Sequence, residues 1–239
     1  MKKTLLLIGA MVVSLNVFAQ TNELKIAKPS ISLEAGYVDR LFSKGVSYTS
    51  TASQYLGLNL ASPAENNFIP VDIYGGGLLL TENTDSFWTV GLGKDIKLGG
   101  SDKYKLRIDT AYATRKTDLD EPANNEVSGT IALVNPLLTP YIGYTRDWKI
   151  EQNGFTLGVK RDFTVSDWLT ISPNAAYHTF DDYESIELST RLSVTKWRQL
   201  TPFIEGRYVD NNFDKASFNW ASYEASGDTT WLAGLSLNF

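Results

Sequence analysis

The sequence contains no cysteine among its 239 residues. An exported chain of this kind would fold without the disulfide framework on which many small secreted domains depend. Its stability would have to come from packing and from complete pairing of the backbone. The absence of a thiol also excludes a lipoprotein, because no cysteine is available to carry the lipid.

Long apolar runs and an excess of basic residues are missing as well. After residue 19 no apolar run approaches the roughly 20 residues that a transmembrane helix requires, which excludes membrane insertion by helices. Lys and Arg total 22 against 27 Asp and Glu. This acidic balance argues against a nucleic-acid partner, which would need a basic face.

The first 19 residues have the features of a cleaved secretory signal peptide. Lys2 and Lys3 precede an uncharged, mostly apolar segment from residue 4 to residue 13. Ala19 supplies the small residue at the cleavage site, which predicts Gln20 as the mature N-terminus. Loss of the two lysines would change the formal net charge from −5 to −7. We expect residues 20–29 to be a short lead-in and residues 30–239 to form one domain.

The chain ends in an alternating stretch, residues 229–239. From residue 231 apolar side chains occupy every odd position: Trp231, Ala233, Leu235, Leu237 and Phe239. The even positions after Leu232 are smaller or more polar. A period of two over this length predicts a strand with two different faces.

The same alternation recurs from residue 30 onward. Between residues 104 and 112, for example, Lys105, Arg107 and Asp109 separate apolar or aromatic side chains. A charged residue between apolar ones at this period indicates that the two faces of the strand meet different solvents. We predict twelve strands, with ten or fourteen as alternatives: 30–37, 55–60, 69–74, 88–93, 104–112, 127–134, 141–148, 155–160, 169–178, 186–194, 203–208 and 229–239.

The connections and the aromatic residues follow a pattern of their own. Connections after odd-numbered strands vary widely in length and are rich in Asp, Asn and Glu, whereas most of the others are compact. The Gly75–Gly77 triplet is followed by no helix pattern or Lys-Ser/Thr pair, so it predicts a strand kink or tight corner and no phosphate site. Aromatic residues gather near strand ends, as belts at two lipid–water interfaces would place them: Tyr37, Trp88, Tyr104, Tyr112, Tyr141, Trp148, Trp168, Tyr177, Trp197, Tyr208 and Trp231.

The terminal strand and the predicted signal peptide together resemble Gram-negative outer-membrane β-barrel proteins, in particular small porin-like channels. In that family the last strand ends in Phe or Trp, is read by the barrel-assembly machinery and closes the barrel against the first strand. The resemblance implies an all-β, transmembrane, antiparallel up-and-down barrel of about twelve strands in the outer membrane. Residues 20–29 would be periplasmic, the barrel would contact lipid and lipopolysaccharide, and the assembly signal would comprise Trp231, Leu235, Leu237 and Phe239.

If the apolar face meets lipid, the opposite face lines the lumen. Charges there have to face water or one another, because a charge near the bilayer midplane costs about 2–4 kcal/mol. The predicted lining consists of Glu34, Asp72, Lys105, Arg107, Asp109, Lys160, Asn174, His178, Glu187, Arg191, Glu205 and Arg207. It predicts a channel for passive diffusion of small hydrophilic solutes, with no cofactor and no metal site.

A closed barrel is the first alternative. Ion pairs such as Glu205–Arg207 and Lys105–Asp109 could fill the interior, because twelve strands lie between a packed eight-stranded barrel and an open porin. The acidic outer loops, Thr117–Glu126 and Asp210–Asp228, would then serve adhesion or ligand and phage binding.

A barrel enzyme, a lipase or a protease, is the second alternative, and it would centre on His178, the only histidine. Outer-membrane phospholipase has a nucleophilic Ser two positions after its His, whereas this chain has Phe180 there. Asp181 and Asp182 beside His178 resemble part of the acid and His grouping of omptin proteases, but the other omptin motifs are missing. We therefore expect no catalysis.

Overall fold

The structure is a computed structural model that describes residues 29–40, 42–44, 46–47, 52–64, 67, 69–81, 85–116, 124–148, 151–197, 199–212 and 228–239. The predicted signal peptide and residues 20–28 lie outside these ranges. Most described residues belong to strands. Among them, no helix is long and apolar enough to cross a membrane.

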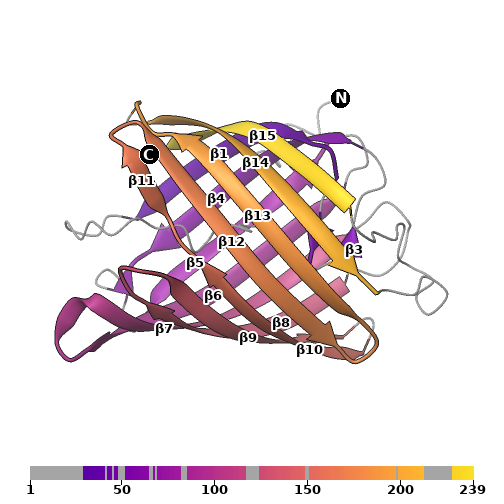
Figure 1. Cartoon of the computed structure of the whole chain (residues 1–239), viewed down its shortest axis with the longest axis horizontal. Coiled ribbons are helices and arrows are strands. Elements are labelled where there is room, and N and C mark those ends of the chain that lie inside the picture. Colours follow the sequence, from indigo (N-terminus) through magenta and orange to yellow (C-terminus); the bar gives the residue numbers. More distant parts are fainter. Residues whose placement is uncertain are drawn as a thin grey trace.

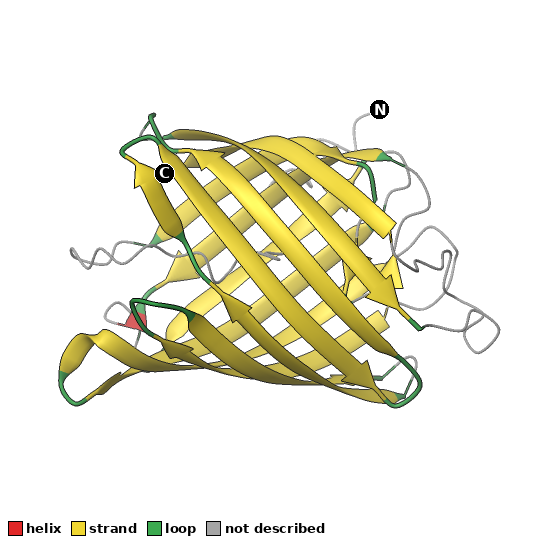
Figure 2. Ribbon diagram, viewed as in Figure 1, coloured by secondary structure: helices red, strands yellow, loops and turns green. Residues whose placement is uncertain are grey.

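Twelve long antiparallel strands close into a barrel (Figures 1 and 2). They are β1 (Ser30–Val38), β4 (Ser53–Ser62), β5 (Asp72–Leu80), β6 (Ser86–Leu98), β7 (Ser101–Lys116), β8 (Asn124–Val134), β9 (Thr139–Asp147), β10 (Gln152–Lys160), β12 (Leu169–Phe180), β13 (Glu184–Val194), β14 (Leu200–Asn211) and β15 (Asp228–Asn238). Each pairs with its neighbours along the chain, and β1 pairs with both β4 and β15. The predicted antiparallel twelve-stranded barrel is confirmed.

Three short strands complete the topology. β2 (Phe42–Ser43) and β3 (Val46–Ser47) form a small hairpin in the connection between β1 and β4. β11 (Phe163–Ser166) pairs with the start of β12, between the strands predicted at residues 155–160 and 169–178.

The alternation of the sequence becomes a difference between the two sides of the wall. On β13, Ile186 and Leu188 are 46% and 47% exposed on the outside, whereas Glu187 between them is only 6% exposed. The other strands expose Ile, Leu, Val, Tyr and Trp in the same way. An apolar outer surface of this extent is unfavourable in water, and a closed sheet is one of the few structures whose backbone is fully paired in hydrocarbon.

Two predicted strand boundaries were wrong. β5 begins at Asp72, so residues 69–71 precede it, and the Gly75–Gly77 triplet lies inside the strand and pairs with both β4 and β6. The turn predicted at residues 98–103 consists of Gly99 and Gly100 alone, with φ of 61° and 72°. Two consecutive left-handed residues form the tight turn that suits a two-residue hairpin. The β6–β7 hairpin therefore extends beyond the neighbouring strands (Figure 1).

Most predicted belt aromatics face outward near strand ends. Tyr37 and Trp231 pack at 5.3 Å between ring centroids, and Tyr112 and Trp148 at 6.4 Å. Both pairs lie at the end of the barrel away from the start of β1 and the end of β15. Tyr141 is the exception, because it faces inward and donates a hydrogen bond to Asn174.

The first and last strands meet along a seam that depends on glycine. Gly36 of β1 lies opposite Gly234 of β15. A Cβ on Gly36 would lie 2.2 Å from the carbonyl oxygen of Ala233 and 2.9 Å from the ring of Tyr55. A Cβ on Gly234 would lie 2.9 Å from the Tyr55 hydroxyl. The Tyr55 ring therefore packs over both glycines and leaves no room for side chains there.

We expect Gly36→Ala to destabilise the barrel by about 1–3 kcal/mol, because its methyl group meets backbone that cannot move aside. Unfolding of the refolded protein in urea, followed by tryptophan fluorescence, measures this change. Gly206→Ala is the matched control, since no atom lies within 4 Å of its added Cβ. Equal stability of both variants would contradict the role of the glycine seam.

Candidate functional site

The structure places all twelve predicted interior residues on the inner side of the wall. Their neighbours along each strand face outward, as Ile204 and Tyr208 do on either side of Glu205 and Arg207. Strand geometry explains this placement, because every second side chain of a barrel strand faces the interior. The predicted interior charges fall into three groups on different strands, with Lys160 apart from them. Arg115, Glu126 and Asp147 on β7, β8 and β9 are further buried charges, which sequence reasoning missed.

The first group, the Arg107 cluster, consists of Arg107 with Asp72, Asp95 and Asp109, together with Lys105. Arg107 donates a hydrogen bond of 2.9 Å to Asp109 and also forms ion pairs with Asp72 and Asp95. Lys105 Nζ lies 3.3 Å from Asp95. The cluster joins β5, β6 and β7.

The predicted Lys105–Asp109 pair was wrong. Residues four apart on one strand are separated by about 14 Å at about 3.4 Å per residue. Asp95 lies directly opposite Arg107 on the neighbouring strand and is therefore within reach of Lys105. Asp109 pairs with Arg107, which is only two residues away on the same face.

The second group, the Arg207 cluster, is the most deeply buried. Arg207 lies 2.7 Å from Glu205 and 3.4 Å from Glu187, and all three are at most 6% exposed. The predicted Glu205–Arg207 pair is confirmed. His178 lies 4.0 Å from Glu187 and 2.9 Å from the Thr156 hydroxyl, so the cluster extends from β14 to β10.

The third group crosses the seam. Arg191 of β13 pairs with Glu34 of β1 at 3.3 Å, and the Tyr55 hydroxyl donates to Glu34 at 2.8 Å. The Arg191 guanidinium also lies 3.5 Å from the ring centroid of Phe203, a cation–π contact. Arg191 lies opposite Glu205 in the sheet register, but Glu205 pairs with Arg207, and Arg191 reaches across two strands to Glu34.

Lys160 on β10 and Asn174 on β12 are the remaining predicted interior residues. Lys160 Nζ lies 5.8 Å from the ring centroid of Tyr141, and the Tyr141 hydroxyl donates to Asn174 at 3.1 Å. Tyr141 thus belongs to the interior, although its position near a strand end suggested a belt.

Sequence reasoning missed an apolar cluster on the inner face. It is made of Val38, Tyr55, Leu78, Leu80, Phe87 and Phe203, all at most 8% exposed. The unbroken run Leu78–Leu80 conceals which side chains point inward, and only the continuation of β5 to Leu80 places Leu78 and Leu80 on the inner face with Asp72. The interior therefore has an apolar cluster on β1, β4, β5, β6 and β14 in addition to its charged groups.

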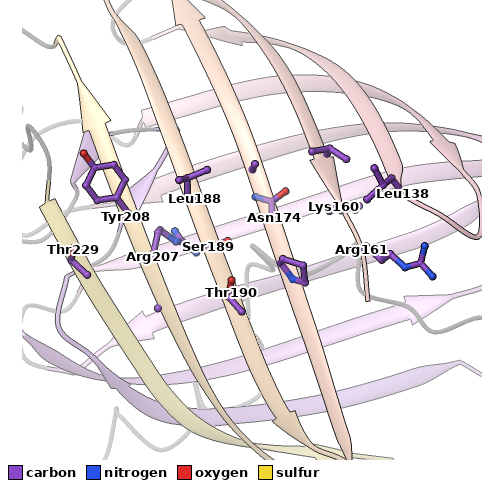
Figure 3. Close-up of a pocket in the computed structure, with 14 residues that line it drawn as sticks. Leu138, Lys160, Arg161, Asn174, Leu188, Ser189, Thr190, Arg207, Tyr208 and Thr229 are labelled. Carbon is purple, nitrogen blue, oxygen red and sulfur yellow. The ribbon is translucent and has the colours of Figure 1, made fainter. Parts of the chain in front are cut away.

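A pocket of about 510 Å³ lies along β10 to β15 (Figure 3). Most of its lining belongs to outward positions, including Leu188, Thr190 and Tyr208. Gly206 has no side chain, and a Cβ added there would meet no atom within 4 Å. The pocket is therefore open at this point of the wall. It opens on the outer surface, and the inward residues Lys160, Asn174 and Arg207 contribute to its lining.

The surroundings of His178 differ from those of a catalytic histidine. Its Nε2 is 4.0 Å from Glu187, which exceeds a hydrogen bond, and Glu187 is paired with Arg207. Phe180, at the position of a lipase nucleophile, stacks on Tyr183 at 4.7 Å between centroids. Among the described residues, no group of three or more His, Asp or Glu could hold a metal ion.

Comparisons with known proteins give structural similarity only. No family model matches the chain, and no curated protein matches it. The KdgM porin in complex with disordered oligogalacturonate is 14% identical, with a TM-score of 0.55 over 88% of this chain and 99% of that one. The NanC porin is also 14% identical, with a TM-score of 0.57 over 87% of this chain and 98% of that one. At this identity the similarity establishes a shared barrel fold.

We expect Arg207→Met to destabilise the protein by about 3–5 kcal/mol, because Glu187 and Glu205 would remain buried without their cation. The midpoint of urea unfolding measures this effect. Combining it with Glu187→Gln and Glu205→Gln should recover most of the loss. Lys196→Met, an exposed lysine in the β13–β14 turn, is the control, and a loss of the same size there would contradict a specific role for the cluster.

Proposed function

We propose that this protein is an outer-membrane channel of a Gram-negative bacterium that passes small hydrophilic solutes by diffusion. The observation that carries the proposal is the pairing of an apolar outer wall with ionised side chains on the inner wall of a closed barrel. Ionised groups inside a membrane protein have to meet water or one another. The Arg107 cluster and the Arg191–Glu34 pair lie on opposite halves of the wall, where such water would pass between them.

The membrane location is supported by strand length and by the aromatic pairs. The twelve strands contain 9 to 16 residues, and about 9–11 tilted residues cross a bilayer. Outward aromatic rings near strand ends suit the lipid–water interface, where they would also meet lipopolysaccharide. Residues 1–19 would direct export and be removed near Ala19.

The last strand would carry the signal for the barrel-assembly machinery. Trp231, Leu235, Leu237 and Phe239 all project outward and are 40–69% exposed. A row of accessible apolar side chains on one face of β15 is a surface that an assembly partner could read. The strand pairs with β1 and β14 in the closed barrel, so this reading would precede closure.

A closed barrel remains the second candidate, and the interior apolar cluster favours it. Val38, Leu80 and their neighbours are fully buried, so they occupy part of the cross-section. In a barrel without a path, binding would fall to the outer loops. Of the loops predicted for this role, residues 117–123 and 213–227 lie outside the described residues. Catalysis is no part of the proposal.

Single-channel conductance of the refolded protein in a planar bilayer tests the proposal. We expect steady conductance steps, and we expect Arg107→Gln to change the cation-to-anion permeability ratio by about twofold or more toward cations, because local potentials of several kT act on ions in such a site. The reason is that Asp72, Asp95 and Asp109 would then lose the cation that pairs with all three.

Lys94→Gln is the matched control, because Lys94 is exposed on the outer side of β6 beside the same cluster. It removes an equal charge outside the interior and should leave the ratio unchanged. A folded barrel with no conductance would reject the channel and favour the closed scaffold.

A further inference from the structure

The described residues 42–44 and 46–47, between β1 and β4 in the chain, form the β2–β3 hairpin. The hairpin carries Lys44 at its tip, with a φ of 53°. A left-handed residue at this point is typical of the tight two-residue turn of a hairpin. Figure 1 shows β3 at the end of the barrel away from the C-terminus.

The start of the connection between β1 and β4 is fixed to β15. Arg40 forms an ion pair with Asp228, and its backbone N–H donates to the Thr230 hydroxyl at 3.1 Å. The Thr230 hydroxyl in turn donates to the Arg40 carbonyl at 3.0 Å. The N–H of Asp39 donates to the carbonyl of Trp231 at 3.0 Å. These four interactions therefore fix the start of the connection against β15.

The tip contacts the far wall through its side chain. Lys44 Nζ lies 2.5 Å from Glu126 Oε1 on β8, and Arg115 of β7 binds the other oxygen of Glu126 at 2.9 Å. Asp147 of β9 lies opposite Glu126 in the sheet register and is 3% exposed. Four strands, β4 to β7, separate β1 from β8 around the barrel.

The tip also contacts a second wall through its backbone. The hydroxyl of Ser185 on β13 donates to the Lys44 carbonyl at 3.1 Å, and the Tyr183 hydroxyl approaches the same oxygen at 3.4 Å. Two strands, β14 and β15, separate β1 from β13 on this side. A single residue thus contacts both β8 and β13, which the three strands β9, β10 and β12 separate in the barrel wall.

We propose that the β2–β3 hairpin is the constriction of the channel and that Lys44 sets the fixed charge at its narrowest section. This inference rests on the proposed channel function. A tethered hairpin narrows the opening to the space beside its tip, and ions passing there meet Lys44 and Arg115 opposite Glu126 and Asp147. Two charges of each sign balance one another, so the removal of one charge should leave a net charge that favours ions of the opposite sign. Rings of charged side chains set ion selectivity in this manner.

Reversal potentials in a salt gradient across a planar bilayer test the inference. We expect Lys44→Met to shift selectivity toward cations and Glu126→Gln to shift it toward anions. Either change also removes the ion pair that holds the tip against β8, so we expect single-channel conductance to rise about twofold as the constriction widens on that side. A purely structural contact would move both variants in the same direction or not at all.

The lack of cysteine permits a second, independent measurement. Lys44→Cys introduces the only thiol of the chain, and a bulky thiol reagent added on the side of the mouth should reduce the conductance at least about twofold. Lys196→Cys, at the opposite end of the barrel, is the control and should show no reduction. Heat-dependent migration in gels verifies that each variant is folded.

The outcomes separate the two proposals. Conducting wild-type protein whose selectivity and conductance are unaffected by all three Lys44 and Glu126 variants would overturn the constriction and leave the channel intact. Folded wild-type and variant proteins that never conduct would overturn the channel and the constriction together. Opposite selectivity shifts with block at Lys44→Cys support both.

Discussion

The need to pair every backbone N–H and C=O group governs this structure. A sheet with an apolar outer face can lie in hydrocarbon only if it has no open edge, so the first and last strands have to meet. This closure happens at the β1–β15 seam. Gly36 and Gly234 lie opposite each other there, under the Tyr55 ring. The same Tyr55 binds Glu34, so closure of the sheet also positions the first ionised group of the interior.

Closure then determines how the interior charges can be arranged. A strand offers only every second side chain to the inside, and each charge has to find its partner either two residues along or on a nearby strand. Glu205 and Arg207 take the first solution, whereas Lys105 and Arg191 take the second. The result is three clusters linked across strands, with an apolar patch between β1 and β6. The charge and shape of the interior are therefore set by the closed sheet. At one end of the barrel, the β2–β3 hairpin contacts both β8 and β13.

Much of the fold could be predicted because it depends on local periodicity. Ile186, Glu187 and Leu188 alternate in the sequence, and they alternate across the wall. Prediction was poorest where the signal was broken. The run from Gly75 to Leu80 contains no polar residue to reveal the inner face, so the end of β5 was placed too early and Leu78 and Leu80 were not recognised as interior. Tyr141 shows the same difficulty, because an aromatic residue near a strand end suits a belt and a lumen equally well.

The sequence by itself determined the class of structure and the inner and outer faces of most strands, because both follow from a period of two within a short segment. Only the tertiary structure decided which charges pair, since Arg191 and Glu34 are 157 residues apart and meet through barrel closure. The position of Lys44 between β8 and β13 was decided in the same way. Lys44 lies in a polar connection, which has no periodic pattern. Its partners are set by which strands the closed barrel brings within reach of the hairpin tip.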